Sequence, residues 1–89
     1  DIGNGMQVYL ANDGLTALNY VNENELTVDY VISDYNMRDM NGDILIKSIH
    51  KTKHCKKEFL LLTAPEADEI KKLDASFKHD GIHNFTIFT

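Results

Sequence analysis

An aspartate stands at the end of the most strand-like segment of the chain and is followed by a loop rich in turn residues. The segment Val28–Ser33 (VDYVIS) is rich in β-branched and aromatic side chains, and Asp34 follows it directly. In an open α/β sheet, ligands bind just beyond the carboxyl ends of parallel strands, so an acid there faces the functional crevice. Asp34 is therefore the first candidate for chemistry on a bound ligand. A simpler alternative is an acid that ends its strand and accepts a turn hydrogen bond.

Two other groups of side chains could carry metal or acid–base chemistry. His50 and His54 stand four residues apart, with Cys55 adjacent. That spacing suits two metal ligands on a helix, but the sequence places no third, so exposed histidines near a helix end are the simpler interpretation. Asp39 and Asp43 resemble a paired-carboxylate site. Asp43 is better explained as an N-cap-like or first-turn acid, which the helix dipole favours.

Length and composition predict one small globular domain over residues 1–89. A chain of 89 residues buries a single modest core, and 43% apolar with 26% charged residues is ordinary for a globular protein. The net charge of -5 gives no basic surface for nucleic acid or an anionic membrane, so neither is an expected partner. The single cysteine, Cys55, cannot form an internal disulfide, which favours a reducing compartment such as the cytoplasm. No apolar run approaches the roughly 18 residues of a transmembrane helix.

The elements that must position these side chains alternate between strand and helix. Four segments have strand character, and three segments between them have helical spacing. The strands are predicted at Met6–Ala11, Val28–Ser33, Phe59–Thr63 and Asn84–Phe88, and the helices at Leu15–Glu25, Gly42–Lys51 and Glu66–Phe77. Pro65 suits the first turn of the last helix. The lysines at positions 51, 53, 56 and 57 are interpreted as a solvated helix end and loop. The order βαβαβαβ predicts an α/β fold with a parallel sheet.

From Gln7 onward, the chain resembles the receiver domain of response regulators. Each matching segment is short, but their order and spacing together are specific to that family. They are the turn Ala11-Asn12-Asp13-Gly14, the segment DYNMRDMNG from Asp34 to Gly42, the strand end Leu62-Thr63-Ala64, and Gly81-Ile82-His83-Asn84-Phe85. The resemblance implies a flavodoxin-like, doubly wound parallel sheet and a role in two-component or phosphorelay signalling.

The resemblance also assigns roles to four residues. It implies that Asp34 is the phosphoacceptor for a histidine kinase or a histidine phosphotransfer protein, and that Thr63 contacts the phosphoryl oxygens. It implies that Asn36 offers its backbone carbonyl to a Mg²⁺ ion that Asp34 also binds, and that the rotamer of Phe85 reports the switch. Phosphoryl transfer spreads charge over three equatorial oxygens, so a hard cation and hydrogen-bond donors must meet at Asp34. Thr63 could instead be the N-cap of the next helix, and Phe85 could be a core side chain.

Two features depart from the family's pattern. The family's first strand, which ends in the acidic pair that binds Mg²⁺, and the helix after it would precede Asp1. We therefore expect a sheet that is incomplete at its N-terminal side, in a fragment, a truncated product or a chain completed by strand exchange. Phe88 stands where the family has a phosphoryl-binding lysine, unless the alignment shifts that lysine beyond Thr89. With Phe88 in that position, a cation that would stabilise an acyl phosphate is missing.

Three classes of function follow from these patterns. The first is a phosphoacceptor receiver domain, which is a signalling module and not an enzyme. The second is a pseudo-receiver, an interaction or dimerisation domain without working phosphorylation. Unpaired strand edges are templates for pairing with another chain, so a homodimer or strand-exchanged dimer is part of this expectation. The third, a small hydrolase or nucleotide-binding protein, is disfavoured because no GxxxxGK[ST], GxGxxG or GxSxG motif is present.

Overall fold

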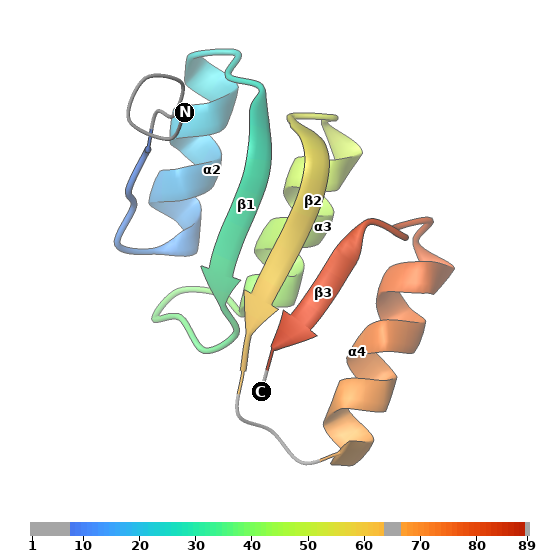
Figure 1. Ribbon diagram of the computed structural model, residues 1–89. Helices are drawn as coiled ribbons and strands as arrows, with labels where there is room; N and C mark the ends of the chain where they lie inside the picture. Colours follow the sequence, from blue (N-terminus) through green and yellow to red (C-terminus); the bar gives the residue numbers. More distant parts are fainter. Residues whose placement is uncertain (1–7, 64–66, 89) are drawn as a thin grey trace.

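The computed structural model describes residues 8–63 and 67–88, which form a small α/β fold with a three-stranded parallel sheet (Figure 1). The sheet order is β1-β2-β3, so β1 and β3 are its edges. The elements, in chain order, are α2 (Gly14–Glu23), β1 (Val28–Asp34), α3 (Gly42–Lys51), β2 (Cys55–Leu62), α4 (Ala67–His79) and β3 (Phe85–Phe88). The predicted α/β class is therefore confirmed.

One face of the sheet carries the core. Ser33 is in register with Leu61, and Phe59 with Phe85, so these side chains share a face. The face packs on the apolar sides of α3 and α4, and Phe85 meets the ring of Phe77 with centroids 4.9 Å apart. The buried core consists of Leu45, Ile46, Ile49, Phe59, Leu61, Leu73, Phe77 and Ile82. In α3 the spacing of Leu45, Ile46 and Ile49 aligns them along one side, as an amphipathic helix requires.

The opposite face of the sheet is not covered by α2, α3 or α4, and Figure 1 shows it in front of α3. The residues of this face alternate with the core residues along each strand. Large apolar side chains on it remain exposed: Tyr30 by 55%, Ile32 by 68%, Leu62 by 42% and Phe88 by 45%. Within residues 8–63 and 67–88, the arrangement therefore has two layers, and only one face of the sheet packs against helices.

Local signals fix the ends of the helices. The side chain of Asp13 accepts a hydrogen bond from the Thr16 N–H at 2.8 Å and caps α2. At the end of α4, Gly81 has a φ of 82°, in the left-handed region that favours glycine. The Gly81 N–H donates to the Lys78 carbonyl and the Ile82 N–H donates to the Phe77 carbonyl, which is a Schellman motif. The motif turns the chain so that Ile82 enters the core.

The predicted first strand is wrong over the part of it that the structure describes. Residues 8–11 form no strand, and Met6 and Gln7 lie outside the described residues. No described strand pairs with the outer edge of β1. A β-rich segment needs a hydrogen-bonding neighbour to become a strand, and residues 8–11 have no described strand beside them.

Several element boundaries also differ from the prediction. Strand β2 begins at Cys55, not Phe59, so Lys56 and Lys57 lie in a strand and not in a helix end or loop. The lysines interrupt the apolar run but remain exposed on β2, and the Lys57 Nζ lies 5.8 Å from the centroid of the Tyr30 ring. Helix α2 ends at Glu23, two residues early, and α4 ends at His79, two residues later than predicted. Pro65 and Glu66 lie outside the described residues.

Candidate functional site

The carboxyl ends of the strands bring Asp34 and Thr63 to one edge of the sheet. Asp34 is in register with Leu62, and Leu62 with Phe88. Hydrogen bonding between the strands continues for one more residue in both strand pairs. The Tyr35 N–H donates to the Leu62 carbonyl, and the Thr63 N–H donates to the Phe88 carbonyl, both at 2.9 Å. Asp34 is exposed and Thr63 is half-buried. A carboxylate and a hydroxyl thus end two neighbouring parallel strands, where α/β folds bind ligands.

The start of the helix after Thr63 lies outside the described residues. Helix α4 is described from Ala67 onward, and residues 64–66 between it and Thr63 are not described. The N-cap alternative for Thr63 therefore stays a prediction.

The loop after Asp34 is held closed by hydrogen bonds and by close packing. The Gly42 N–H donates to the Tyr35 carbonyl at 2.7 Å, and the Asn41 Nδ2 donates to the Tyr35 hydroxyl at 3.3 Å. The Ser33 hydroxyl donates to the Asp34 carbonyl at 2.8 Å. A Cβ on Gly42 would lie 2.2 Å from that carbonyl oxygen, so only glycine fits. The Asp34 backbone is therefore fixed from two sides while its carboxylate faces solvent.

The described residues make only part of a magnesium site. Asn36 lies two residues after Asp34 in the chain. It is exposed and forms an isolated β-bridge with Asn41. An Asp34 carboxylate oxygen and the Asn36 carbonyl are hard ligands that suit Mg²⁺. Across residues 8–63 and 67–88, however, no group of three or more His, Cys, Asp or Glu side chains is arranged to hold a metal ion. The described residues therefore do not complete a magnesium site.

A groove of about 260 Å³ runs along the outer edge of β1. It lies between that edge, the segment from Tyr9 to Asp13, and α2. Apolar side chains line most of it, and both Asp13 and Asp34 border it. The groove therefore joins the candidate acceptor to the unpaired strand edge.

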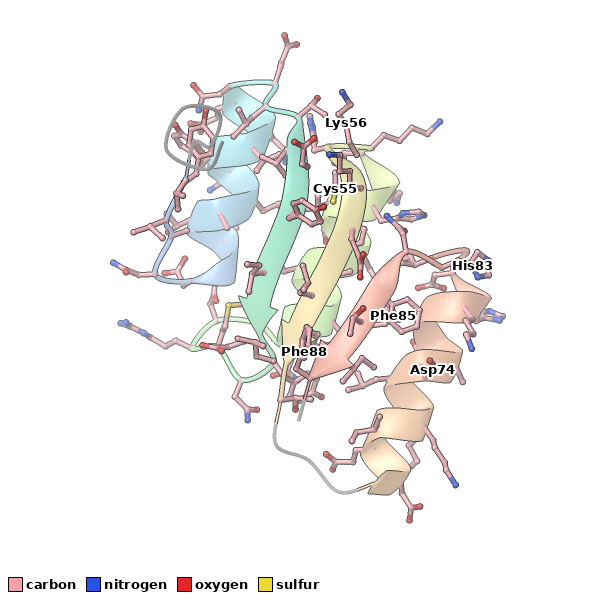
Figure 2. All side chains as sticks on the ribbon, in the orientation of Figure 1. Cys55, Lys56, Asp74, His83, Phe85 and Phe88 are labelled. Carbon is pink, nitrogen blue, oxygen red and sulfur yellow. The ribbon has the colours of Figure 1, made fainter. Side chains whose placement is uncertain are left out.

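The two C-terminal phenylalanines occupy opposite ends of β3, as Figure 2 shows. Phe85 is in register with Phe59, three steps before the pair of Leu62 with Phe88. At about 3.3 Å per residue, Phe85 stands some 10 Å along the sheet from the Asp34 edge. Phe85 packs on Phe77 in the core, so the structure does not bring it together with Asp34 and Thr63. Phe88 lies at the edge itself, where it presents an exposed aromatic ring and no cation.

A carboxylate that the sequence did not assign to this site connects the loop to α2. The Asp39 carboxylate accepts hydrogen bonds from the Gly14 N–H at 3.0 Å and from the Leu15 N–H at 2.7 Å. These hydrogen bonds lower the pKa of Asp39 below its usual value of 3.8, and the bond from Leu15 has the largest effect. The motif Asn12-Asp13-Gly14 indicated the helix start, but nothing in the sequence could indicate a second acid arriving from a loop 25 residues away.

The alternative metal site at His50, His54 and Cys55 gains no support from the geometry. The ring of His50 packs edge-on against Phe59, with centroids 6.2 Å apart. The Cys55 thiol donates to the Asp29 and Glu58 carbonyls, at 3.6 and 3.4 Å. Burial raises the pKa of Cys55 above its ordinary value, so the thiol stays protonated at neutral pH.

Compared with known proteins, the chain matches no protein-family model and no curated protein at a significant level. Within the described ranges, no helix combines the length and the apolar character needed to cross a membrane. The functional assignment therefore depends on the strand-end geometry around Asp34.

Proposed function

We propose that this chain is a phosphoacceptor receiver domain of a two-component or phosphorelay system. Asp34 takes the phosphoryl group from a phosphohistidine of a histidine kinase or of a histidine phosphotransfer protein, and the chain acts as a signalling module in the cytoplasm. The proposal rests on one observation: an exposed carboxylate and a threonine hydroxyl end adjacent parallel strands. The three parallel strands and their helices are compatible with part of a flavodoxin-like sheet.

In the proposed reaction, the acceptor side chain needs little more than the right position and a negative charge. A carboxylate oxygen of Asp34 attacks phosphorus, the P–N bond to the donor imidazole breaks, and an aspartyl phosphate forms. The leaving imidazole takes up a proton from solvent. In this proposal the Thr63 hydroxyl donates a hydrogen bond to one phosphoryl oxygen and so stabilises part of the charge that develops. The closed loop contributes by holding the Asp34 backbone still, so that little ordering is left to do on binding.

Intact-mass spectrometry after incubation with acetyl phosphate and Mg²⁺ tests this proposal. We expect one phosphoryl adduct on the wild type that hydroxylamine removes, as it removes an acyl phosphate. The adduct is expected to be absent from Asp34→Asn. Asp29→Asn is the matched control, because Asp29 is an exposed acid at the other end of the same strand. Thr63→Val should form the adduct more slowly, because the donor to the phosphoryl oxygen is lost.

Two results would contradict the proposal. The first is a folded wild type, as judged by circular dichroism, that gains no adduct. The second is an adduct that persists in Asp34→Asn, which would place the modified group elsewhere. Loss of the adduct in Asp29→Asn as well would show that the assay reports general damage to the fold.

A second candidate function is an interaction or dimerisation domain of the pseudo-receiver kind. The unpaired edge of β1, the groove beside it and the exposed Ile32 favour this candidate. Edge strands present unpaired N–H and C=O groups, which another chain can pair with. A homodimer or strand-exchanged dimer would use this edge.

Size-exclusion chromatography with light scattering tests the second candidate. A dimer of the wild type that Ile32→Lys converts to a monomer would support pairing through β1, because a charge on an edge strand opposes pairing. Leu15→Lys is the matched control, since Leu15 is an exposed apolar residue on α2, away from the sheet. A wild type that is monomeric over a wide range of concentration would refute the dimer.

A further inference from the structure

The loop that follows Asp34 also holds the start of α2. Residues 35–41 connect β1 to α3, and Asp39 lies inside this loop. Its two carboxylate oxygens accept the N–H groups of Gly14 and Leu15, at 3.0 and 2.7 Å. These amides belong to the first turn of α2, which has no acceptors of its own within the helix. The next amide, Thr16 N–H, goes instead to Asp13, the local cap.

Close packing reinforces this connection. Gly14 is buried, and a Cβ at this position would lie 2.5 Å from the Met40 Cγ and 3.3 Å from the Met37 Cε. The two methionines come from the same loop as Asp39. Gly14, the first residue of α2, therefore packs directly against the loop that follows the candidate acceptor Asp34. The hydrogen bonds to Asp39 lie beside this contact.

The loop is short and closed, so its two ends respond to each other. The bond from Gly42 N–H to the Tyr35 carbonyl joins its ends, and Asp39 is five residues from Asp34 along the chain. A phosphoryl group on Asp34 carries a charge of about −1.5 to −2 in place of the −1 of the carboxylate, so the negative charge there grows by about 0.5 to 1. The added charge repels the Asp39 carboxylate and attracts N–H groups of the loop, and we expect these effects to weaken the hydrogen bonds between Asp39 and α2.

We propose that Asp39 couples the state of Asp34 to α2: loading of Asp34 releases the amides of Gly14 and Leu15, and α2 becomes the element that reports the switch. This coupling rests on the proposed function and adds its regulation. The geometry gives an internal reference, because Thr16 N–H is held by Asp13 and not by the loop. The Thr16 amide should therefore stay protected while its two neighbours become free.

Hydrogen exchange of the backbone amides, followed by NMR, tests the coupling on the full chain with and without acetyl phosphate and Mg²⁺. Intact mass measured on the same samples gives the fraction of Asp34 that carries the phosphoryl group. On loading, we expect the Gly14 and Leu15 amides to exchange about fivefold faster or more, which is the lower end of ordinary coupling between sites. The Thr16 amide is expected to change by less than about twofold.

Two variants separate the Asp39 bonds from general loosening of the helix. Asp39→Asn removes the charge that the phosphoryl group repels, and it should abolish the response to loading while Asp34 still forms its adduct. Asp39→Ser gives a second test if the asparagine variant folds poorly. Asp13→Ala is the matched control, because it removes the other cap of α2 and should leave the response of Gly14 and Leu15 in place.

The outcomes distinguish this coupling from the proposed function beneath it. An adduct on Asp34 with unchanged Gly14 and Leu15 amides would overturn the coupling and leave the receiver function intact. A full response in both Asp39 variants would also overturn it. A folded chain that forms no adduct would overturn both proposals together.

Discussion

Replacing Gly42 with alanine should destabilise the protein far more than an alanine in a helix normally does. The new methyl group would lie 2.2 Å from the Asp34 carbonyl oxygen, 2.8 Å from the Leu61 Cδ1 and 2.9 Å from the Ser33 Oγ. An ordinary carbon–oxygen contact is about 3.3 Å, so atoms must move by about 1 Å. The Asp34 carbonyl cannot yield cheaply, because its strand is held in the ladder by the bond from Tyr35 N–H to Leu62.

The magnitude follows from two opposing effects. Alanine gains up to about 1 kcal/mol of helix propensity over glycine. Overpacking in a well-packed site costs about 1–3 kcal/mol, and more where backbone must move. We therefore expect Gly42→Ala to lower the free energy of unfolding by about 2 kcal/mol, the upper end of the overpacking cost less the gain in helix propensity. Urea unfolding followed by far-ultraviolet circular dichroism measures it, and the chain has no tryptophan to serve as a fluorescent probe.

Gly14→Ala is the matched control. Its methyl group would also be crowded, at 2.5 and 2.7 Å, but against the Cγ and Sδ of Met40, which belong to a flexible side chain. We expect a change within about 1 kcal/mol of the wild type, because methionine adapts to irregular space. A loss below about 1 kcal/mol in Gly42→Ala, or equal losses in the two variants, would refute the reasoning about backbone contact.

Three further predictions concern the core, the cysteine and Asp39, the loop acid that accepts hydrogen bonds from the start of α2. Phe77→Ala should cost about 3–5 kcal/mol in urea unfolding because Phe77 is fully buried, and Phe88→Ala, about half exposed, should cost much less. At mildly alkaline pH, iodoacetamide should alkylate the Cys55 thiol more slowly than the thiol of glutathione, because burial raises the pKa of Cys55. In denaturant the two thiols should react equally fast. Because helix amides lower the pKa of Asp39 below 3.8, its carboxylate stabilises the fold above that pH. Asp39→Asn should therefore be less stable than the wild type at neutral pH, and the difference should vanish as acid protonates Asp39.

The strand ends were predictable from sequence because strong local signals mark them. The β-branched run before Asp34 and the apolar run before Thr63 both have the patterns of buried parallel strands, and both lie in strands. The role of Gly42 as the start of a helix was equally local. Parallel strands bring their carboxyl ends to one edge of the sheet, so the placement of Asp34 and Thr63 at the same edge followed from the topology.

The errors came from features that depend on neighbours distant in sequence. Residues 8–11 have strand-like composition but no described strand beside them, and β-propensity does not by itself form a strand. Lys56 and Lys57 look like loop residues, yet they extend β2 because β1 pairs with that strand from Cys55 onward. The bonds from α2 to Asp39 join residues 24 and 25 positions apart, a relation that no local pattern contains.

If Asp34 is the phosphoacceptor that we propose, we expect the residue at the end of β3 to affect how strongly Asp34 holds a phosphoryl group. Phe88 is 45% exposed and in register with Leu62, which in turn is in register with Asp34, so two strand spacings, about 10 Å, separate Phe88 from the acceptor. A lysine there would extend an ammonium group toward the acceptor, and its exposure keeps the cost to folding small. An approach to about 4 Å in water contributes about 1 kcal/mol, a factor of about five. Phe88→Lys should therefore raise the fraction of the acetyl phosphate adduct at steady state by up to about fivefold, whereas Phe88→Gln, polar but neutral, should not. Equal adduct in the two folded variants would show that the positive charge at this edge is irrelevant to Asp34. A larger adduct in the lysine variant alone would mean that a positive charge at the end of β3 stabilises the adduct on Asp34. Phe88 would then weaken the acceptor, because it places an aromatic ring where a cation could lie.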